Sequence, residues 1–187
     1  MYKSVLDYFE ETVKRVPEKK AIRHNEDDCT FAMLQEQAQK LGSYMIELVG
    51  DIKNRPIVVL LPKSMDAVVA DLGISYSCNI FNNLDVKTPV HRLENIIKLL
   101  KPVMVITNNA YKDMLSWQEY DVKLLNLDET VLCDININAE ELEKRRKELI
   151  DTDPFCIINT SGSTGTPKGV VLNYKSFFDF VTWADET

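Results

Sequence analysis

The chain has 187 residues, and its 22 Lys and Arg against 29 Asp and Glu give a formal net charge of −7. This charge argues against a protein that holds a nucleic-acid backbone by bulk electrostatics, so any bound anion must be captured by a local site. With 45% hydrophobic residues, 6 Gly and 7 Pro, the composition also argues against a disordered or collagen-like chain. A protein of this size can hide roughly 70% of its unfolded surface, which is enough for a hydrophobic core.

Membrane and secretion signals are missing from the sequence. No apolar run approaches the roughly 20 residues that span a bilayer, and the acidic N-terminal segment lacks the apolar centre of a signal peptide. Four cysteines show neither C-x-x-C nor zinc-binding spacing: Cys29, Cys78, Cys133 and Cys156. We therefore expect reduced thiols in a cytoplasmic protein that has neither a membrane nor a nucleic-acid partner.

The first 50 residues have the pattern of two helices separated by a hairpin. Apolar residues from Ser4 to Val16 keep helical spacing, and Pro17 ends that pattern. Two short β-prone segments then flank a polar turn at residues 25–28, which predicts a hairpin. Thr30 can cap the long helix that follows, and Gly50 can end it.

From residue 57 onward, strands and helices alternate. Unbroken apolar runs, which suit strands covered on both faces, lie at residues 57–61, 103–107, 122–127 and 155–158. A helical pattern follows the first run, and a second helix opens at Thr88-Pro89 with the proline as its first residue. The charge-dense segment Ala139–Ile150 is interpreted as a solvated helix or a connector.

This alternation indicates βαβ units. We predict an α/β fold in which a mainly parallel sheet is flanked by helices, with a single lobe covering residues 1–187.

Residues 158–170 carry the groups that favour phosphate chemistry, in the order Ile-Asn-Thr-Ser-Gly-Ser-Thr-Gly-Thr-Pro-Lys-Gly-Val. Glycines let the backbone approach a ligand and turn successive N–H groups into a concave anion site. Hydroxyl groups can donate to phosphate oxygens, and a lysine adds a compact positive charge. These are the components of a polyphosphate-binding loop.

The segment is neither a Walker A loop nor a Rossmann fingerprint. Pro167 precedes Lys168 and disfavours the helical conformation that a Walker A lysine needs. Gly162 and Gly165 lack the further glycine of G-x-G-x-x-G. We therefore expect Lys168 in a mobile loop that closes over a nucleotide.

A solvated linker is the alternative, because Ser, Thr and Gly clusters between regular elements are usually linkers. The apolar strand before the segment, the Lys168-Gly169 ending and the resumed strand Val170–Leu172 favour the phosphate-binding interpretation.

Residues Thr160 to Gly169 resemble, without a gap, the signature [YF]-T-S-G-[ST]-T-G-x-P-K-G of the adenylate-forming (AMP-binding) ligases. Two weaker resemblances lie upstream in the right order. Thr30–Leu34 is similar to the family's T-Y-x-E-L helix start, and Leu72–Pro102 is similar to its L-K-A-G-x-x-Y-V-P-L-D-P-x-x-P-x-x-R-L stretch. The resemblance thus covers nearly the whole chain.

Three places depart from the family pattern. Asn159 replaces the usual aromatic residue before the loop, Cys78 stands where glycine is common, and Asn82-Asn83 replaces Val-Pro. These departures leave the phosphate-loop signature intact.

The resemblance implies an enzyme that joins a carboxylate to ATP, releases pyrophosphate and leaves an acyl-adenylate. A thiol of coenzyme A or a phosphopantetheine carrier then takes the acyl group from a small carboxylic or amino acid substrate. The hydroxyls and amides of the loop would hold the β- and γ-phosphates, and Lys168 would steady the departing pyrophosphate. The implied ATP-binding residues are Thr160, Ser161, Gly162, Ser163, Thr164, Gly165, Thr166, Lys168 and Gly169.

Whole enzymes of the family are more than twice as long. We therefore expect this chain to correspond to the first lobe of their N-terminal domain. The acyl pocket, the Mg²⁺ ligand and the catalytic lysine are expected outside the chain, and the 187 residues alone should form no acyl-adenylate. An ATP–pyrophosphate exchange signal would refute this expectation. A non-catalytic nucleotide- or phosphate-binding or interaction module is the alternative, and exposed apolar surface could drive self-association.

The Gly-Ser-Thr-Gly form of the loop and residues 175–183 are more similar to amino-acid-activating and D-alanine-ligase-like members than to fatty-acyl ones. Phe177, Phe178, Val181 and Trp183 are interpreted as the buried apolar face of a helix. Asp85 is interpreted as a turn or cap residue, and the two histidines, His24 and His91, as surface or structural residues.

Overall fold

The computed structural model describes residues 4–24, 27–161 and 167–185. Its helices and strands are, in chain order, α1 (Val5–Arg15), β1 (Lys20–His24), β2 (Asp27–Thr30), α2 (Phe31–Val49), β3 (Pro56–Val59), α3 (Met65–Tyr76), β4 (Ile80–Asn83), α4 (Val90–Leu100), β5 (Met104–Thr107), η1 (Trp117–Tyr120), β6 (Lys123–Asn126), η2 (Leu132–Asp134), α5 (Ala139–Glu148), β7 (Pro154–Ser161), β8 (Pro167–Asn173) and α6 (Tyr174–Asp185).

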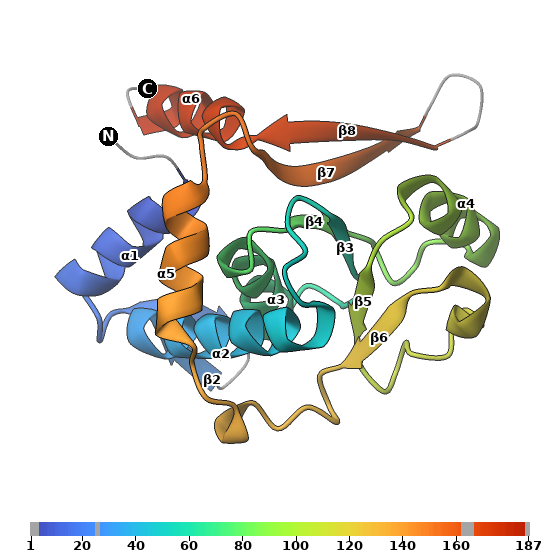
Figure 1. Ribbon diagram of the computed structural model, residues 1–187, viewed down its shortest axis with the longest axis horizontal. Coiled ribbons are helices and arrows are strands. Elements are labelled where there is room, and N and C mark those ends of the chain that lie inside the picture. Colours follow the sequence, from blue (N-terminus) through green and yellow to red (C-terminus); the bar gives the residue numbers. More distant parts are fainter. Residues whose placement is uncertain (1–3, 25–26, 162–166, 186–187) are drawn as a thin grey trace.

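The main sheet has six strands in the order β6-β5-β3-β4-β7-β8 (Figure 1). The first five strands of that order are parallel to their neighbours, and β8 runs antiparallel to β7. A separate antiparallel pair joins β1 to β2. The predicted α/β fold with a mainly parallel, helix-flanked sheet is confirmed.

Both faces of the central strands are covered, which explains their unbroken apolar runs. On one face, Ile57 and Val59 of β3 pack with α2 and α3. On the other face, Val58 and the adjacent Leu60 pack with α4 and η1. Figure 1 shows α3 and α4 on opposite sides of the sheet.

The N-terminal elements match the sequence pattern closely. The backbone N–H of Ser4 donates to the Asp7 carboxylate at 3.0 Å where α1 begins. Thr30 caps α2, since its hydroxyl accepts from the Met33 N–H at 3.2 Å. Gly50 ends α2 with a φ of 71°, a conformation that favours glycine.

Two expectations around α4 need correction. Strand β4 was absent from the predicted strands, because its sequence Ile-Phe-Asn-Asn lacks an apolar run. The helix after it begins at Val90, and Pro89 is its extended N-cap rather than its first helical residue.

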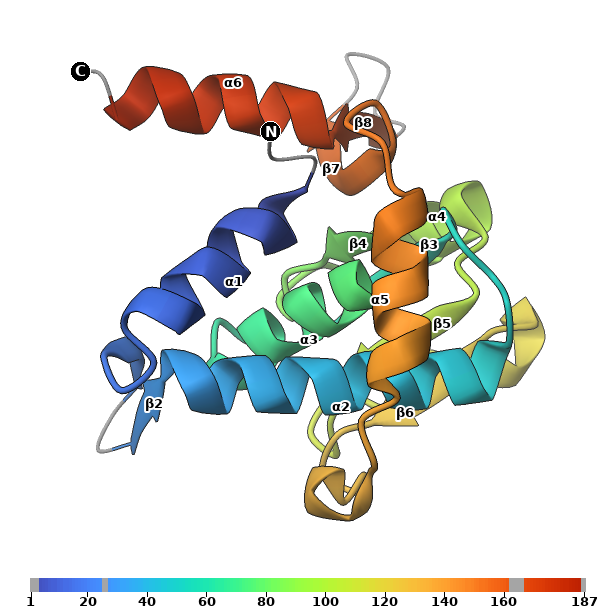
Figure 2. The same cartoon turned by 60° about the vertical axis from the view of Figure 1, so that its left-hand side comes forward.

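The segment predicted as a solvated helix or a connector is a helix with one buried face. Leu142 and Arg145 of α5 are buried, and Figure 2 shows α5 crossing α2. The Arg145 guanidinium, only 1% exposed, donates at 2.8–3.2 Å to five acceptors: Glu141 Oε1, Ile52 O, Ser77 O, Gly50 O and Asp51 Oδ1. This one side chain therefore joins α5 to the segments that follow α2 and α3.

The expected buried face of α6 is wrong in part. Phe177 packs against Phe155 and Phe178 against Tyr8, with ring centroids 5.2 and 5.4 Å apart. Trp183, however, is 63% exposed, because the distal turns of α6 extend past the body of the fold.

Two further findings concern the membrane and the thiols. Within the described ranges, the structure contains no helix whose length and apolar character would let it span a bilayer. The four cysteines are unpaired, as expected, and three of them are buried while Cys133 is exposed.

Replacing Arg145 by alanine should lower the free energy of unfolding by about 3 kcal/mol or more, because three main-chain carbonyls lose their charged donor. Urea unfolding followed by circular dichroism measures the change. Lys147→Ala, on the same helix but with a 73% exposed side chain, is the control and should cost much less. Equal costs for the two variants would contradict a structural role for the buried guanidinium.

Candidate functional site

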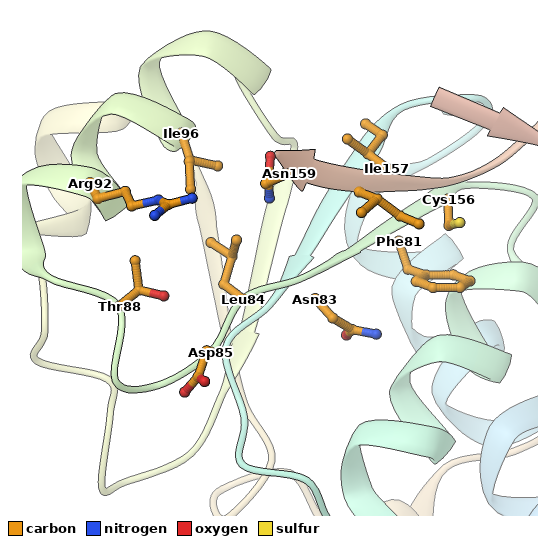
Figure 3. Close-up of a pocket in the computed structure, with 11 residues that line it drawn as sticks. Phe81, Asn83, Leu84, Asp85, Thr88, Arg92, Ile96, Cys156, Ile157 and Asn159 are labelled. Atoms are coloured by element: carbon orange, nitrogen blue, oxygen red, sulfur yellow. The ribbon is translucent and has the colours of Figure 1, made fainter. Parts of the chain in front are cut away.

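A cavity of about 580 Å³ opens where β4 and β7 end, between these strands and α4 (Figure 3). The two parallel strands are in register at Phe81 and Cys156. In open α/β sheets, ligands bind outside the carboxyl ends of the strands, which is where this cavity lies.

A side-chain link between β4 and β7 borders the cavity. The Asn82 amide nitrogen donates to the Ile157 carbonyl at 2.7 Å, and its oxygen accepts from the Asn159 amide at 3.0 Å. Asn82 is fully buried; its bond to Ile157 is shielded from water, and its bond to Asn159 is partly buried. Its side chain continues the connection between the strands beyond their main-chain pairing.

Polar residues of β4, β7, α4 and the loop between β4 and α4 line the cavity (Figure 3). Arg92 comes from α4, Thr88 and Asp85 from the loop before it, and Asn83 from β4. Among the described residues, Arg92 is the one cationic side chain that lines the cavity. The Asp85 carboxylate accepts from the Lys87 N–H at 2.8 Å, which confirms Asp85 as a turn residue.

A second cavity of about 620 Å³ adjoins the first and shares Asn83 and Asp85 with it. It lies between the ends of β3 and β4, whose following helices cover opposite faces of the sheet. Such a reversal is the point where an α/β sheet most often binds ligands. Lys63 and Lys87 line this cavity and give it positive charge.

Residues 158–161 and 167–170 of the hydroxyl-rich segment belong to the paired strands β7 and β8 (Figure 1), and Ile158 and Asn159 line the first cavity. Thr160 lies opposite Lys168, and the Thr160 hydroxyl donates to the Lys168 carbonyl at 3.4 Å. Paired residues of an antiparallel ladder share one face of the sheet, so these two exposed side chains lie side by side.

The expectation that Lys168 lies in a mobile loop is wrong, because Lys168 belongs to β8. Pro167 begins that strand, a position where its missing N–H is tolerated. As expected, Lys168 is in no helix, which agrees with the exclusion of a Walker A loop. Ser161 ends β7 opposite Pro167, while five of the implied ATP-binding residues lie outside the described residues: Gly162, Ser163, Thr164, Gly165 and Thr166.

Gly169 of β8 has a packing role that the sequence did not reveal. A Cβ at this position would lie 3.1 Å from Ile157 Cγ2 and 3.4 Å from Leu100 Cδ2. The absence of a side chain lets the hairpin approach α4 closely.

Asp71 of α3 contributes an unusual carboxyl group near the same strand ends. One oxygen accepts from the Asn83 amide at 2.8 Å, and the other is buried without a hydrogen-bond partner in the described part of the chain. Asp71 lies beside an apolar cavity of about 550 Å³ lined by Phe81 and Phe155 among others. Burial raises the pKa of Asp71 to about 7, and the Asn83 hydrogen bond opposes that rise.

Metal ligands do not cluster in the described ranges. Residues 4–24, 27–161 and 167–185 contain no group of three or more His, Cys, Asp or Glu side chains that could hold a metal ion. His91 is exposed on α4.

Sequence reasoning found the hairpin but missed the cavities next to it. Lys63 and Lys87 belonged to no motif, and Arg92 lay in the Leu72–Pro102 resemblance without a site role; only the fold brings the three residues to one edge of the sheet. The departures Asn82 and Asn159 were visible in the sequence, but their hydrogen bond was not.

Comparison with known proteins gives one family model and similar proteins that agree with it. The AMP-binding enzyme model matches residues 9–187. The D-alanine–D-alanyl carrier protein ligase of Listeria welshimeri is 27% identical over 190 aligned positions, covering 98% of this chain and 35% of the ligase. A dimodular nonribosomal peptide synthase of Bacillus subtilis is 30% identical over 178 positions, covering 95% of this chain and 7% of the synthase. The chain therefore spans about a third of the ligase, at 35%, and a smaller share of the synthase.

Solved structures show the same fold. VinN in complex with 3-methylaspartate superposes with a TM-score of 0.74 at 22% identity, over 92% of this chain and 48% of VinN. The N-terminal subdomain of Klebsiella oxytoca NpsA, in complex with 3-hydroxybenzoyl-AMSN, gives a TM-score of 0.71 at 18% identity, over 93% of this chain and 42% of NpsA.

Replacing Asp71 by asparagine should stabilise the protein more at pH 8 than at pH 5. The folded carboxyl group, with a pKa of about 7, stays protonated through a range in which the unfolded group, with a pKa of 3.8, is ionised. Wild-type stability therefore falls as the pH rises toward 7 and stays lower above it, whereas the amide does not titrate.

The gap between Asp71→Asn and wild type should widen by about 2 kcal/mol from pH 5 to pH 8, measured by urea unfolding at each pH. Asp66→Asn, at an exposed position of the same helix, is the control for the loss of a negative charge from α3. A constant gap for Asp71→Asn would contradict the raised pKa.

Proposed function

Because the chain belongs to the AMP-binding enzyme family, we propose that its β7–β8 hairpin binds the triphosphate of ATP in an acid-activating ligase. The observation that carries this proposal is the pairing of Thr160 with Lys168. Their exposed side chains present a hydroxyl group and a cation near the end of the hairpin. The intervening residues 162–166 add the remaining hydroxyls and glycines of the signature.

The proposed reaction needs charge neutralisation above all. A carboxylate oxygen of the acid attacks the α-phosphorus of ATP, and the bond from that phosphorus to the bridging oxygen of the β-phosphate breaks. Pyrophosphate leaves with the electron pair, and an acyl-adenylate remains. The Lys168 ammonium and the loop hydroxyls would stabilise the negative charge on the β- and γ-phosphates as this bond breaks.

The relatives support a substrate class. The carrier protein ligase is named for D-alanine, the synthase for peptides, and VinN was solved with 3-methylaspartate. We propose that the acid is an amino acid or another small carboxylic acid, and that a thiol carrier accepts it. Mg²⁺ would accompany ATP, with its protein ligand outside this chain.

Self-association through exposed apolar residues such as Phe180 and Trp183 stays a prediction.

ATP binding by the 187-residue chain tests the proposal. Isothermal calorimetry should detect binding of ATP and of pyrophosphate, and Lys168→Ala should raise both dissociation constants about tenfold or more. The loss follows from removal of one charge-assisted contact to phosphate. Lys175→Ala, which removes an exposed lysine just beyond the hairpin, is the matched control and should leave both constants unchanged.

Failure to bind either ligand would contradict a triphosphate site in this hairpin. Equal losses for Lys168→Ala and Lys175→Ala would reduce the effect to bulk charge and contradict a specific role for Lys168.

A further inference from the structure

We propose that Asn82 and Asn159 form a positioning pair that fixes the end of β7, and thereby the start of the triphosphate-binding segment. The two residues are 77 positions apart in the chain and are joined by a 3.0 Å hydrogen bond. The proposal about binding rests on the proposed function, while the proposal about strand position rests on the structure alone.

The hydrogen bonds fix the orientation of both amides. Asn82 must present its NH₂ group to the Ile157 carbonyl, because a carbonyl can only accept. Its oxygen therefore faces Asn159, which must in turn present its own NH₂ group. Neither amide can be flipped without losing a bond. The link consequently specifies one arrangement of the two strands.

The pair acts beyond the last register pair of the β4–β7 ladder. β4 and β7 are in register at Phe81 and Cys156, and Asn82 is the next residue of β4. Beyond that point, β7 is held on its inner side by the Asn82 side chain and on its outer side by β8. Thr160 follows Asn159 directly, so a shift of Asn159 is passed to the first residue of the phosphate-binding signature.

Asn159 also lies against the second strand of the hairpin. It is opposite Gly169 in the ladder, and its Oδ1 is 4.0 Å from the position of a Cβ on that glycine. This oxygen is buried without a hydrogen-bond partner among the described residues. Keeping a buried acceptor unpaired is costly, and the bond to Asn82 is what holds the Asn159 side chain in this orientation.

Both positions also differ from the pattern of the family, which commonly has valine at 82 and an aromatic residue at 159. The two departing residues are in direct contact through their hydrogen bond. A change of either residue alone leaves a buried polar group without its partner, whereas a change of both removes the polar pair together.

The test is a double-mutant cycle on the 187-residue chain with Asn82→Val, Asn159→Phe and the double variant. Three readouts are ATP affinity by calorimetry, amide hydrogen exchange of the β7–β8 ladder, and the urea unfolding midpoint. Each single variant should weaken ATP binding about tenfold and speed exchange at the hairpin amides by a similar factor. The double variant should be no worse than the worse single variant.

A second amide pair in the same sheet supplies the control. The Asn126 amide donates to Asn109 Oδ1 at 2.8 Å beside β6, at the opposite side of the sheet from the hairpin. Asn109→Ala removes a bond of the same kind. It should leave ATP affinity and hairpin exchange unchanged even if the unfolding midpoint falls, which separates a positioning role from a general loss of stability.

The outcomes distinguish the two proposals. If wild type binds ATP and Lys168→Ala weakens binding but the asparagine variants do not, the positioning pair is wrong and the proposed function stands. If wild type binds no ATP, the proposed function fails, and hairpin exchange alone decides the positioning role. The positioning role would be overturned if the effects of Asn82→Val and Asn159→Phe simply added in the double variant. It would also be overturned if amide exchange in the hairpin changed no more than in Asn109→Ala.

Discussion

Burial of both faces of the central strands is the constraint from which the site follows. β3 and its neighbours are packed by α2 and α3 on one face and by α4 on the other. Polar side chains on those faces would lose their hydration, so they can gather only at the strand ends. The carboxyl ends of β3, β4 and β7 accordingly carry the two cavities.

The hairpin differs from the rest of the sheet because one of its faces is open. Ile158 and Val170 are about half exposed, and Thr160 and Lys168 lie on the same side of the ladder. The opposite side is packed only in part: Ile157 is buried and Gly169 lies close to Leu100, while Val171 is 57% exposed. The hairpin is therefore anchored at Ile157 and Gly169 and presents polar groups on its open face.

Much of the fold could be predicted because local signals agreed with tertiary structure. The Thr30 cap, the Gly50 stop and the apolar runs each depend on short-range chemistry that the fold retains. Strand β4 could not be predicted, since Asn82 and Asn83 suit a strand only when Ile157 and Asp71 supply partners from elsewhere in the chain. The charges of α5 concealed Arg145, whose burial depends on acceptors about 95 residues earlier. The site was predicted only as far as its motif extended, because the cavity residues come from separate segments.

The strand order also bears on how the chain acquires its structure. β4 pairs with β3 at once, but its other neighbour, β7, is made about 70 residues later, so β4 borders the growing sheet in the meantime. An unpaired, apolar border of this kind invites pairing with other chains. Asn82 and Asn83 place polar side chains on this strand while its second edge is unpaired. The Asn82 amide, which later joins β4 to β7, can thus also discourage aggregation during synthesis.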